Sequence, residues 1–465
     1  MPRFRVAAIK LLERDVRLRM PFRFGAATLT ASPQAFVRAR IRLEDGREAW
    51  GAAAELLAPK WFDKDPALSN EDNFEQLRGS LASAREEYLA HEPRTAWAHA
   101  SPGKGLVANY GPALLDRALL DALCRALGVS FCRAVQANLV GAGSVEGIDL
   151  GAFFATLKPR ATIAARHTVG LVDPITAADQ NARVGDGLPE TLEEVIGRYG
   201  HRYFKLKVAG DVTADLARLC AIAAVLDRSR EPYFASLDGN EQYEDMQGVV
   251  ELWTRMQAEP RLARLVSSIL FIEQPIKRQA ALERPVAGID KPVIIDESDD
   301  ALDAFPRARA LGYRGVSSKT CKGLYKSLLN AARCAQWNKL GSGPNYSAQK
   351  EFGPDPNYFL SGEDLTIQAG LALQQDTALV SLLGLTHLER NGHHYVNGMA
   401  GLPPAEQEVF LAAHPDLYER SHGAVRVRIQ DGLLAIGSLD CAGYASKAMP
   451  DWSTMREMTR TSATA

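Results

Sequence analysis

Five short runs of sequence decide the fold: FKLKV (residues 204–208), LDGN (237–240), FIEQP (271–275), IIDES (294–298) and SSKT (317–320). Each run ends an apolar, strand-like segment with charged or amide side chains. Counted from Lys207 to Lys319, their charged residues follow at steps of 31, 35, 23 and 23 residues, each enough for one strand, one helix and two loops. Strand–helix–strand units in a row build a parallel sheet. The spacing therefore predicts a barrel with its chemistry on the loops at one face.

The same rhythm defines the central domain, which we place at residues 156–400. A strand is predicted over Thr162–Val172, followed by a long polar loop over Asp173–Leu188. Helical spacing of apolar residues then predicts helices over Thr213–Arg228 and Met246–Glu259, with strands between them.

The first 155 residues show a different order, in which strands come before helices. Alternation over Phe36–Leu43 indicates a strand, and helical patterns follow over Asn73–His91 and Ala113–Leu127. Tyr110-Gly111-Pro112 is interpreted as the break between these helices, and Gly128 as a C-cap. Strands followed by helices are typical of an α+β domain.

The tail, residues 401–465, leaves the barrel rhythm. Its segment Val425–Leu434 contains Asp-Gly, which predicts a hairpin turn. We expect this hairpin to join the sheet of the N-terminal domain, so that the tail returns to that domain.

Composition excludes several classes of protein. The formal charge of −2 gives no electrostatic reason to bind nucleic acid or an anionic membrane. The six cysteines form no CxxC or CxxxC pair, so neither a cysteine zinc site nor a disulfide framework is predicted. Charges interrupt the N-terminus where a signal peptide needs an apolar core, and no run approaches 18 apolar residues. We expect a cytoplasmic protein.

Three carboxylates on successive strand ends, Asp238, Glu273 and Asp296, are hard oxygen donors of the kind Mg²⁺ prefers. Each one alone could be an ordinary turn or helix-capping residue. Together, at one-unit spacing, they predict a metal site. Glu297 is the alternative third ligand, because a shift of one residue places a strand side chain on the opposite face.

Two lysine positions accompany the carboxylates. Lys205 and Lys207 point to the same face of their strand, where each ammonium favours the neutral form of the other and a lysine with a lowered pKa can act as a base. A solvated edge strand is the alternative interpretation. Lys319 follows a strand several positions round the barrel and could face Lys207 across a ligand. A metal ion would then stabilise an enediolate while one lysine removes the proton α to a carboxylate.

The ordered set Lys-x-Lys, Asp-x-Asn, Glu-Gln-Pro, Asp-Glu-Ser and a final Lys resembles the enolase superfamily, in particular its muconate lactonising enzyme-like branch. The resemblance covers most of the chain. It implies a modified TIM barrel of (β/α)7β type, with an α+β capping domain formed by the N-terminal region and the C-terminal tail. It also implies one Mg²⁺ per chain and a small carboxylate-bearing substrate, and we expect a homo-oligomer.

The resemblance assigns roles to the residues quoted above. It implies Lys207 and Lys319 as the acid/base pair, Asp238, Glu273 and Asp296 as Mg²⁺ ligands, and Lys205 as a partner that binds the substrate carboxylate or tunes a pKa. Lys319 stands where the mandelate racemase-like branch has an Asp-His pair, which disfavours that branch.

Further residues are expected to bind substrate. These are Asn240 and Glu363, the latter resembling the acidic residue that follows the seventh strand, and Arg23 and Lys60, which could reach a second anionic group. The last two lie in the loops 20–25 and 59–64, whose aromatic residues Phe22, Phe24, Trp61 and Phe62 would exclude water. Packing within the capping domain is the alternative role for both loops.

Two segments depart from the resemblance. A stretch rich in Gly, Pro and Asn, residues 341–357, lengthens the connection after Lys319, and the segment 385–395 is unusually polar. We interpret His387, His393 and His394 as surface or structural residues and predict no second metal, because the sequence shows no second cluster of ligands.

The predicted function is a Mg²⁺-dependent racemase, epimerase or cycloisomerase. The alternatives are an acid-sugar dehydratase on the same scaffold and a catalytically idle ligand-binding relative, which should lack one of the lysines or carboxylates. An unrelated phosphate-binding barrel is disfavoured, because Gly362 and Gly392 are isolated rather than part of a Gly-rich phosphate loop.

Overall fold

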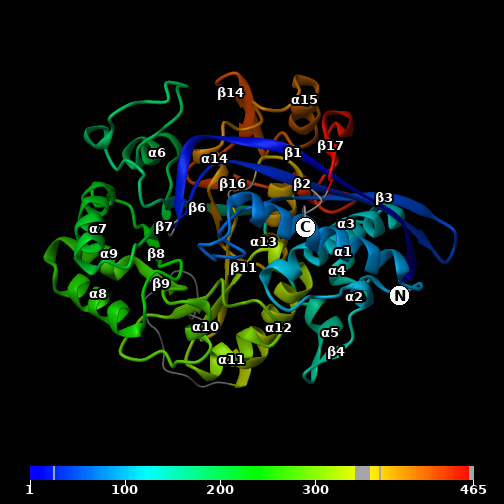
Figure 1. Cartoon of the computed structure of the whole chain (residues 1–465), viewed down its shortest axis with the longest axis horizontal. Coiled ribbons are helices and arrows are strands. Elements are labelled where there is room, and N and C mark those ends of the chain that lie inside the picture. Colours follow the sequence, from blue (N-terminus) through cyan, green and yellow to red (C-terminus); the bar gives the residue numbers. More distant parts are fainter. Residues whose placement is uncertain (25–26, 341–356, 366–367, 460–465) are drawn as a thin grey trace.

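The computed structural model describes residues 1–24, 27–340, 357–365 and 368–459. At its centre, eight parallel strands pair in chain order, and the last of them, β13, pairs with the first, β6, to close a barrel (Figure 1). The predicted parallel barrel is confirmed. Its strands are β6 (Thr162–Val169), β7 (Tyr203–Lys207), β8 (Phe234–Asp238), β9 (Ile269–Glu273), β10 (Val293–Ile295), β11 (Gly315–Ser318), β12 (Phe359–Gly362) and β13 (His387–Arg390).

Helices connect these strands on the outside of the barrel, which gives the expected (β/α)7β order. The predicted helices over 213–228 and 246–259 correspond to α7 and α8 to within a few residues at each end. The connecting helices are α6 (Leu192–Tyr199), α7 (Val212–Leu226), α8 (Met246–Ala258), α9 (Ala263–Ser268), α10 (Arg278–Ala281), α11 (Ala304–Ala310), α12 (Leu324–Leu340) and α13 (Leu371–Leu382), with the 3-10 turns η1 (Ala177–Asp179), η2 (Pro260–Leu262) and η3 (Thr320–Lys322).

The N-terminal part forms an antiparallel sheet covered by helices, shown in blue and cyan beside the barrel in Figure 1. Strands β1 (Phe4–Phe24) and β2 (Ala27–Leu43) are long, and β3 (Glu48–Leu56) completes the hairpin series. The remaining elements before the barrel are α1 (Asn70–Ala90), α2 (Ala96–His99), α3 (Leu106–Leu127), α4 (Phe131–Gln136), β4 (Ser144–Val145), β5 (Ile148–Asp149) and α5 (Leu150–Phe154).

The predicted break at Tyr110-Gly111-Pro112 is wrong, because these residues lie inside α3. At Gly111 a Cβ atom would lie 2.3 Å from the carbonyl oxygen of Ser80, so glycine allows α1 and α3 to approach closely. Pro112 has no N–H to donate to the carbonyl of Ala108. The hydroxyl of Ser80 donates to that carbonyl instead, at 3.1 Å, which explains why the helix continues through the proline.

The predicted hairpin over 425–434 forms only at its Asp-Gly turn, across which Gln430 and Leu433 exchange both backbone hydrogen bonds, and its expected place in the N-terminal sheet is wrong. Strand β15 (Ala424–Val427) pairs with β14 (Tyr418–Ser421), whereas β16 (Leu433–Ala435) adds antiparallel to β6 of the barrel. Asp431-Gly432 is therefore a turn before a strand of the barrel sheet. The tail reaches the N-terminal sheet later, where β17 (Arg456–Glu457) pairs with β1. The short helix α14 (Gly392–Tyr395) follows β13, and the other tail elements are α15 (Pro404–Ala413), η4 (Gly437–Leu439) and η5 (Trp452–Thr454).

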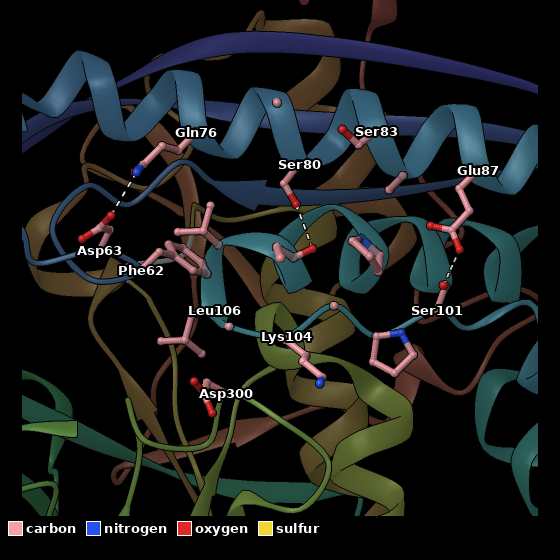
Figure 2. A pocket seen from close by; sticks show the side chains of 18 of the residues that line it. Phe62, Asp63, Gln76, Ser80, Ser83, Glu87, Ser101, Lys104, Leu106 and Asp300 are labelled. Atoms are coloured by element: carbon pink, nitrogen blue, oxygen red, sulfur yellow. Dashed lines mark hydrogen bonds between the residues drawn. The ribbon is translucent and has the colours of Figure 1, made fainter. Parts of the chain in front are cut away.

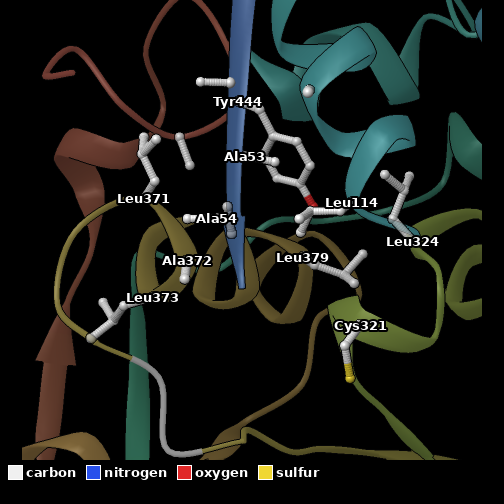
Figure 3. Packing of buried hydrophobic residues seen from close by; sticks show 14 of the residues in the cluster. Ala53, Ala54, Leu114, Cys321, Leu324, Leu371, Ala372, Leu373, Leu379 and Tyr444 are labelled. Carbon is white, nitrogen blue, oxygen red and sulfur yellow. The ribbon is translucent and has the colours of Figure 1, made fainter. Parts of the chain in front are cut away.

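One hydrophobic core joins the capping sheet to the barrel. Figure 3 shows Ala53 and Ala54 of β3 beside Ala372 and Leu379 of α13. Tyr444 of the tail belongs to the same cluster. These residues are almost completely buried. The capping domain is thus packed against the barrel, near the face where the strands end.

Within the described ranges, no helix is both long and apolar enough to cross a membrane. The stretch 341–356 of the Gly/Pro/Asn-rich segment lies outside the described residues.

Candidate active site

The barrel register brings the quoted residues to one end. Lys207 pairs with Asp238, and Asp238 with Glu273, across neighbouring strands. Asp296 and Lys319 directly follow β10 and β11. All five side chains are buried. The structure therefore brings together the lysines and carboxylates that the spacing selected.

Lys205 lies at the centre of this group. Its Nζ is 2.9 Å from Asp238 Oδ2, 2.8 Å from Glu273 Oε2, 2.8 Å from Glu363 Oε2 and 3.1 Å from Glu389 Oε2. Burial alone would lower the pKa of Lys205, but the four carboxylates outweigh burial and raise that pKa well above its usual value. The expected lowering of this pKa by a neighbouring ammonium is wrong, because carboxylates rather than Lys207 dominate the surroundings.

Lys207 and Lys319 each hold one carboxylate. Lys207 Nζ lies 2.5 Å from Asp238 Oδ2, and Lys319 donates a short hydrogen bond to Asp296 Oδ2. The ammonium of Lys319 also lies over the ring of Trp61, 4.7 Å from its centroid. Although burial favours neutral groups, the Lys319–Asp296 pairing raises the pKa of Lys319, and the Lys319 and Lys322 charges hold that of Asp296 well below its usual range.

The three expected Mg²⁺ ligands fit that ion by their chemistry and their charge. All are carboxylates on adjacent strand ends, which is the oxygen donor set that Mg²⁺ prefers. Burial and then the charge of Glu363 raise the pKa of Glu273 well above its usual value, so added positive charge beside Glu273 would be favourable. In this arrangement lysines bond all three carboxylates.

Glu297, the alternative third ligand, faces a different partner. Its Oε1 accepts from Lys64 Nζ at 2.9 Å and from Asn240 Nδ2 at 3.3 Å. Lys64, which the sequence reasoning missed, also donates to the Asn240 carbonyl at 2.8 Å. Asp296, by contrast, lies beside Lys319. This geometry favours Asp296 over Glu297 as the carboxylate that shares the site with Lys319.

A small cavity of about 30 Å³ lies above the lysines. Phe22 and Trp61 from the two predicted loops line it, as do Lys205, Lys207 and Lys319. Among the described residues the cavity has room for little more than one water molecule. Further lining residues are Leu29, Ala58, Asn240, Asp364, Leu365, Glu389 and Asn391.

The structure does not bring Arg23 and Lys60 to this cavity. Arg23 is exposed. Lys60 donates to the carbonyl oxygens of Asp65 and Leu68, so its ammonium bonds backbone groups a few residues away in the chain. The aromatic residues located these loops, but of the two charged residues expected there Lys60 bonds backbone of its own loop and Arg23 faces solvent, whereas Lys64 reaches the barrel end.

A larger open groove of about 730 Å³ lies elsewhere, between α1 and the segment before α3 (Figure 2). Its polar residues bond one another: Gln76 donates to Asp63 at 2.9 Å, and the Ser101 hydroxyl donates to Glu87. It lacks the converging lysines and carboxylates of the barrel end, so we place the chemistry at the smaller cavity.

Three buried residues at the barrel end escaped the sequence reasoning. Arg166 on β6 bonds Glu363, and Lys322 lies 3.2 Å from Asp296 Oδ1. Glu389 on β13 bonds Lys205. Inward alternation along the first and last strands could have selected Arg166 and Glu389. Lys322 lies in a 3-10 turn, where no period identifies it.

The histidines of the polar segment also take unexpected positions. His387 Nδ1 lies 2.9 Å from Arg166. His393 joins His167 and His201 in a group whose ligand nitrogens all lie within 4.8 Å of one another. The expectation that no second cluster of ligands exists is wrong, because His167 and His201 are far from His393 in sequence.

No family model matches the sequence, and no curated protein matches it. The fold, however, matches solved structures of enolase-superfamily proteins. Muconate lactonizing enzyme from Pseudomonas fluorescens is 19% identical, over 97% of this chain and 99% of that chain, with a TM-score of 0.61. The L-Ala-D/L-Glu epimerase from Bacillus subtilis is 15% identical, over 96% and 99%, with a TM-score of 0.58. N-succinyl Arg/Lys racemase from Bacillus cereus is 16% identical, over 84% and 89%, with a TM-score of 0.56. At these identities the likeness establishes the modified TIM barrel with its capping domain.

Proposed function

We propose that the protein is a Mg²⁺-dependent racemase, epimerase or cycloisomerase that removes the proton α to a carboxylate. The observation that carries this proposal is the placement of Lys207 and Lys319. Lys207 is the last residue of β7 and Lys319 directly follows β11; these strands lie four apart in the closed eight-strand barrel, and both lysines line the same cavity. Two lysines on opposite sides of a ligand, one as the neutral amine that takes the proton and the other as the ammonium that gives one, are suited to move a proton from one face of a carbon to the other.

Each residue of the site has a role in this proposal. Asp238, Glu273 and Asp296 would hold one Mg²⁺, which supplies positive charge beside the substrate carboxylate when bound. Lys205 and Asn240 orient the substrate, while Glu363 holds Lys205 in place. Lys207 and Lys319 accept or donate the proton, which requires that each first leaves its carboxylate. Phe22 and Trp61 exclude water from the cavity.

The same pair of lysines also supports an alternative, the dehydration of an acid sugar. One lysine would take the α proton while the other protonates a departing hydroxyl group. An idle ligand-binding relative is disfavoured, since both lysines and all three carboxylates are present and buried together. A small carboxylate-bearing substrate fits either reaction.

Solvent deuterium exchange tests the proposal. The full chain with Mg²⁺ is incubated in D₂O with Ala-Glu dipeptides, N-succinyl amino acids, muconolactone and acid sugars, and NMR follows the α proton. We expect exchange at the α carbon in at least one of these substrate classes. Both Lys207→Ala and Lys319→Ala should lose net turnover of that class. Lys277→Ala, which removes an exposed lysine paired with Glu244, is the control. Wild-type turnover in both site variants would refute the two-base assignment.

A further inference from the structure

A second group of chemistry-bearing side chains lies on the outer side of the barrel. Side chains alternate along a strand, and on β6 Arg166 and Thr168 point inward, where they bond Glu363 and Glu389. His167, between them, therefore points outward. It meets His201, which precedes β7, and His393 of α14, which follows β13.

The three rings form a compact group. His167 Nδ1 and His393 Nε2 are 3.2 Å apart, and the ring centroids of His201 and His393 are 5.0 Å apart. One nitrogen of each residue lies within 4.8 Å of the others. In a tetrahedral zinc site with bonds of about 2.0–2.1 Å, two ligand nitrogens are about 3.3 Å apart. A small movement of the rings would bring the three nitrogens to the separations found in such a site.

A hydrogen bond orients His201 for such a role. Its Nδ1 lies 2.9 Å from the carbonyl oxygen of Ala165, so Nδ1 donates and Nε2 carries the lone pair. Nε2 is buried, and within the described part of the chain it has no hydrogen-bond partner. Metal-binding histidines in proteins are held in the same way, with the second nitrogen donating to a carbonyl or carboxylate. A buried lone pair without a partner is costly unless something binds it.

We propose that His167, His201 and His393 bind one divalent transition-metal ion of the zinc class. The position of the site suggests a structural role. Strands β6 and β13 form the seam where the barrel closes, and α14 begins directly after β13. One ion would therefore link the first strand, the segment entering the second strand and the helix that follows the last strand. The alternative is a metal-free stack in which His167 and His393 share a hydrogen bond.

Co²⁺ is the probe for this site, because tetrahedral nitrogen coordination gives it intense visible absorption. The full chain is stripped with a chelator, saturated with Mg²⁺ to occupy the carboxylate site, and titrated with Co²⁺. We expect one equivalent to bind with visible bands that Zn²⁺ abolishes. His167→Gln and His201→Gln should each weaken binding by about 100-fold or more, since even loss of a residue that only orients a ligand costs 10–100-fold.

Two control variants make the result specific. His91→Gln removes one ring of another close pair, His91 and His99, whose Nδ1 atoms are 3.2 Å apart but which has no third metal-binding side chain beside it among the described residues. It should bind Co²⁺ normally. Lys207→Ala should also bind Co²⁺ normally, so the metal site is tested independently of the proposed reaction. Unchanged Co²⁺ affinity in both cluster variants would overturn the proposal. If those variants do not fold, anomalous diffraction from Zn²⁺-soaked crystals of the unmodified protein decides: a peak between the three rings supports the site, and its absence refutes it.

Discussion

Single residues at the barrel end are defined by the charges that surround them. Lys205 is bonded by four carboxylates within 3.1 Å, so its ammonium is the shared counter-charge of the group. Glu273 shows the opposite balance, since burial and then the charges of its carboxylate neighbours, led by Glu363, raise its pKa. The site therefore depends on Lys205 for its cohesion.

Lys205→Met should destabilise the fold. Removing one partner from a buried ion pair typically costs about 3–5 kcal/mol, because the other charge is left uncompensated. The native state binds a proton at Glu273 that the unfolded chain has already lost, so stability falls as pH rises through the raised pKa. Loss of Lys205 raises the pKa of Glu273 further, and the deficit should be larger at pH 8 than at pH 5. Urea unfolding at both pH values measures it.

Lys207→Met is the matched control for this change. Lys207 bonds only Asp238 among the carboxylates named here, so its removal leaves Glu273 with its ammonium partner. We expect a smaller loss of stability, and a weaker dependence of that loss on pH. Equal losses in the two variants at both pH values would contradict the central role of Lys205.

At the scale of elements, helix α3 carries an unusual buried acid. Asp116 lies in the core of the capping domain, where Tyr88 of α1 donates to its Oδ1 at 2.8 Å. Burial raises the pKa of Asp116 to about 8, and the hydrogen bond from Tyr88 opposes that shift in part. On the same helix, Arg125 pairs with Asp121. Among the residues that the structure describes, no cation contributes in this way to the pKa of Asp116.

Asp116→Asn should therefore remove a pH dependence. With its pKa raised, native Asp116 keeps a proton that the unfolded chain loses above about pH 4, so stability falls as pH rises toward 8, by at most about 1.4 kcal/mol per pH unit. Asparagine mimics the protonated form and can still accept from Tyr88. The variant should gain stability relative to the parent at pH 8 and match it near pH 4, as measured by thermal unfolding across this range. A difference that does not change with pH would contradict the assignment.

The elements of the fold also show which features could be predicted from the sequence and which could not. Strand-end residues such as Asp238 and Lys319 could be predicted, because an apolar run followed by a charge at even spacing is a local signal. Gly111 and Pro112 could not, since their breaker signals are overridden by a tertiary contact, the hydroxyl of Ser80. His167 and His393 meet only when the barrel closes, so no local pattern joins them.

Over the whole molecule, a buried ion pair inside the capping domain also contacts the end of the barrel that carries Lys319. Arg117 of α3 lies 3.1 Å from Glu55 Oε2 of β3 and donates to Thr320 Oγ1 at 3.2 Å. Thr320 directly follows Lys319. Both members of the pair are almost completely buried, inside the continuous core that Figure 3 shows. The capping domain and the barrel should therefore unfold together.

Arg117→Met tests this coupling. Without Arg117 the Glu55 carboxylate is left buried and unpaired, so we expect a loss of about 3–5 kcal/mol. In the double variant Arg117→Met/Glu55→Leu no charge is left unpaired, and much of that loss should be recovered, because replacing a whole buried pair by apolar residues is often close to neutral.

In the parent protein, unfolding followed by tryptophan fluorescence and by far-ultraviolet circular dichroism should give coincident transitions. Two separate transitions would show that the capping domain unfolds independently, and a double variant as unstable as the single one would show that Arg117 acts through packing rather than charge.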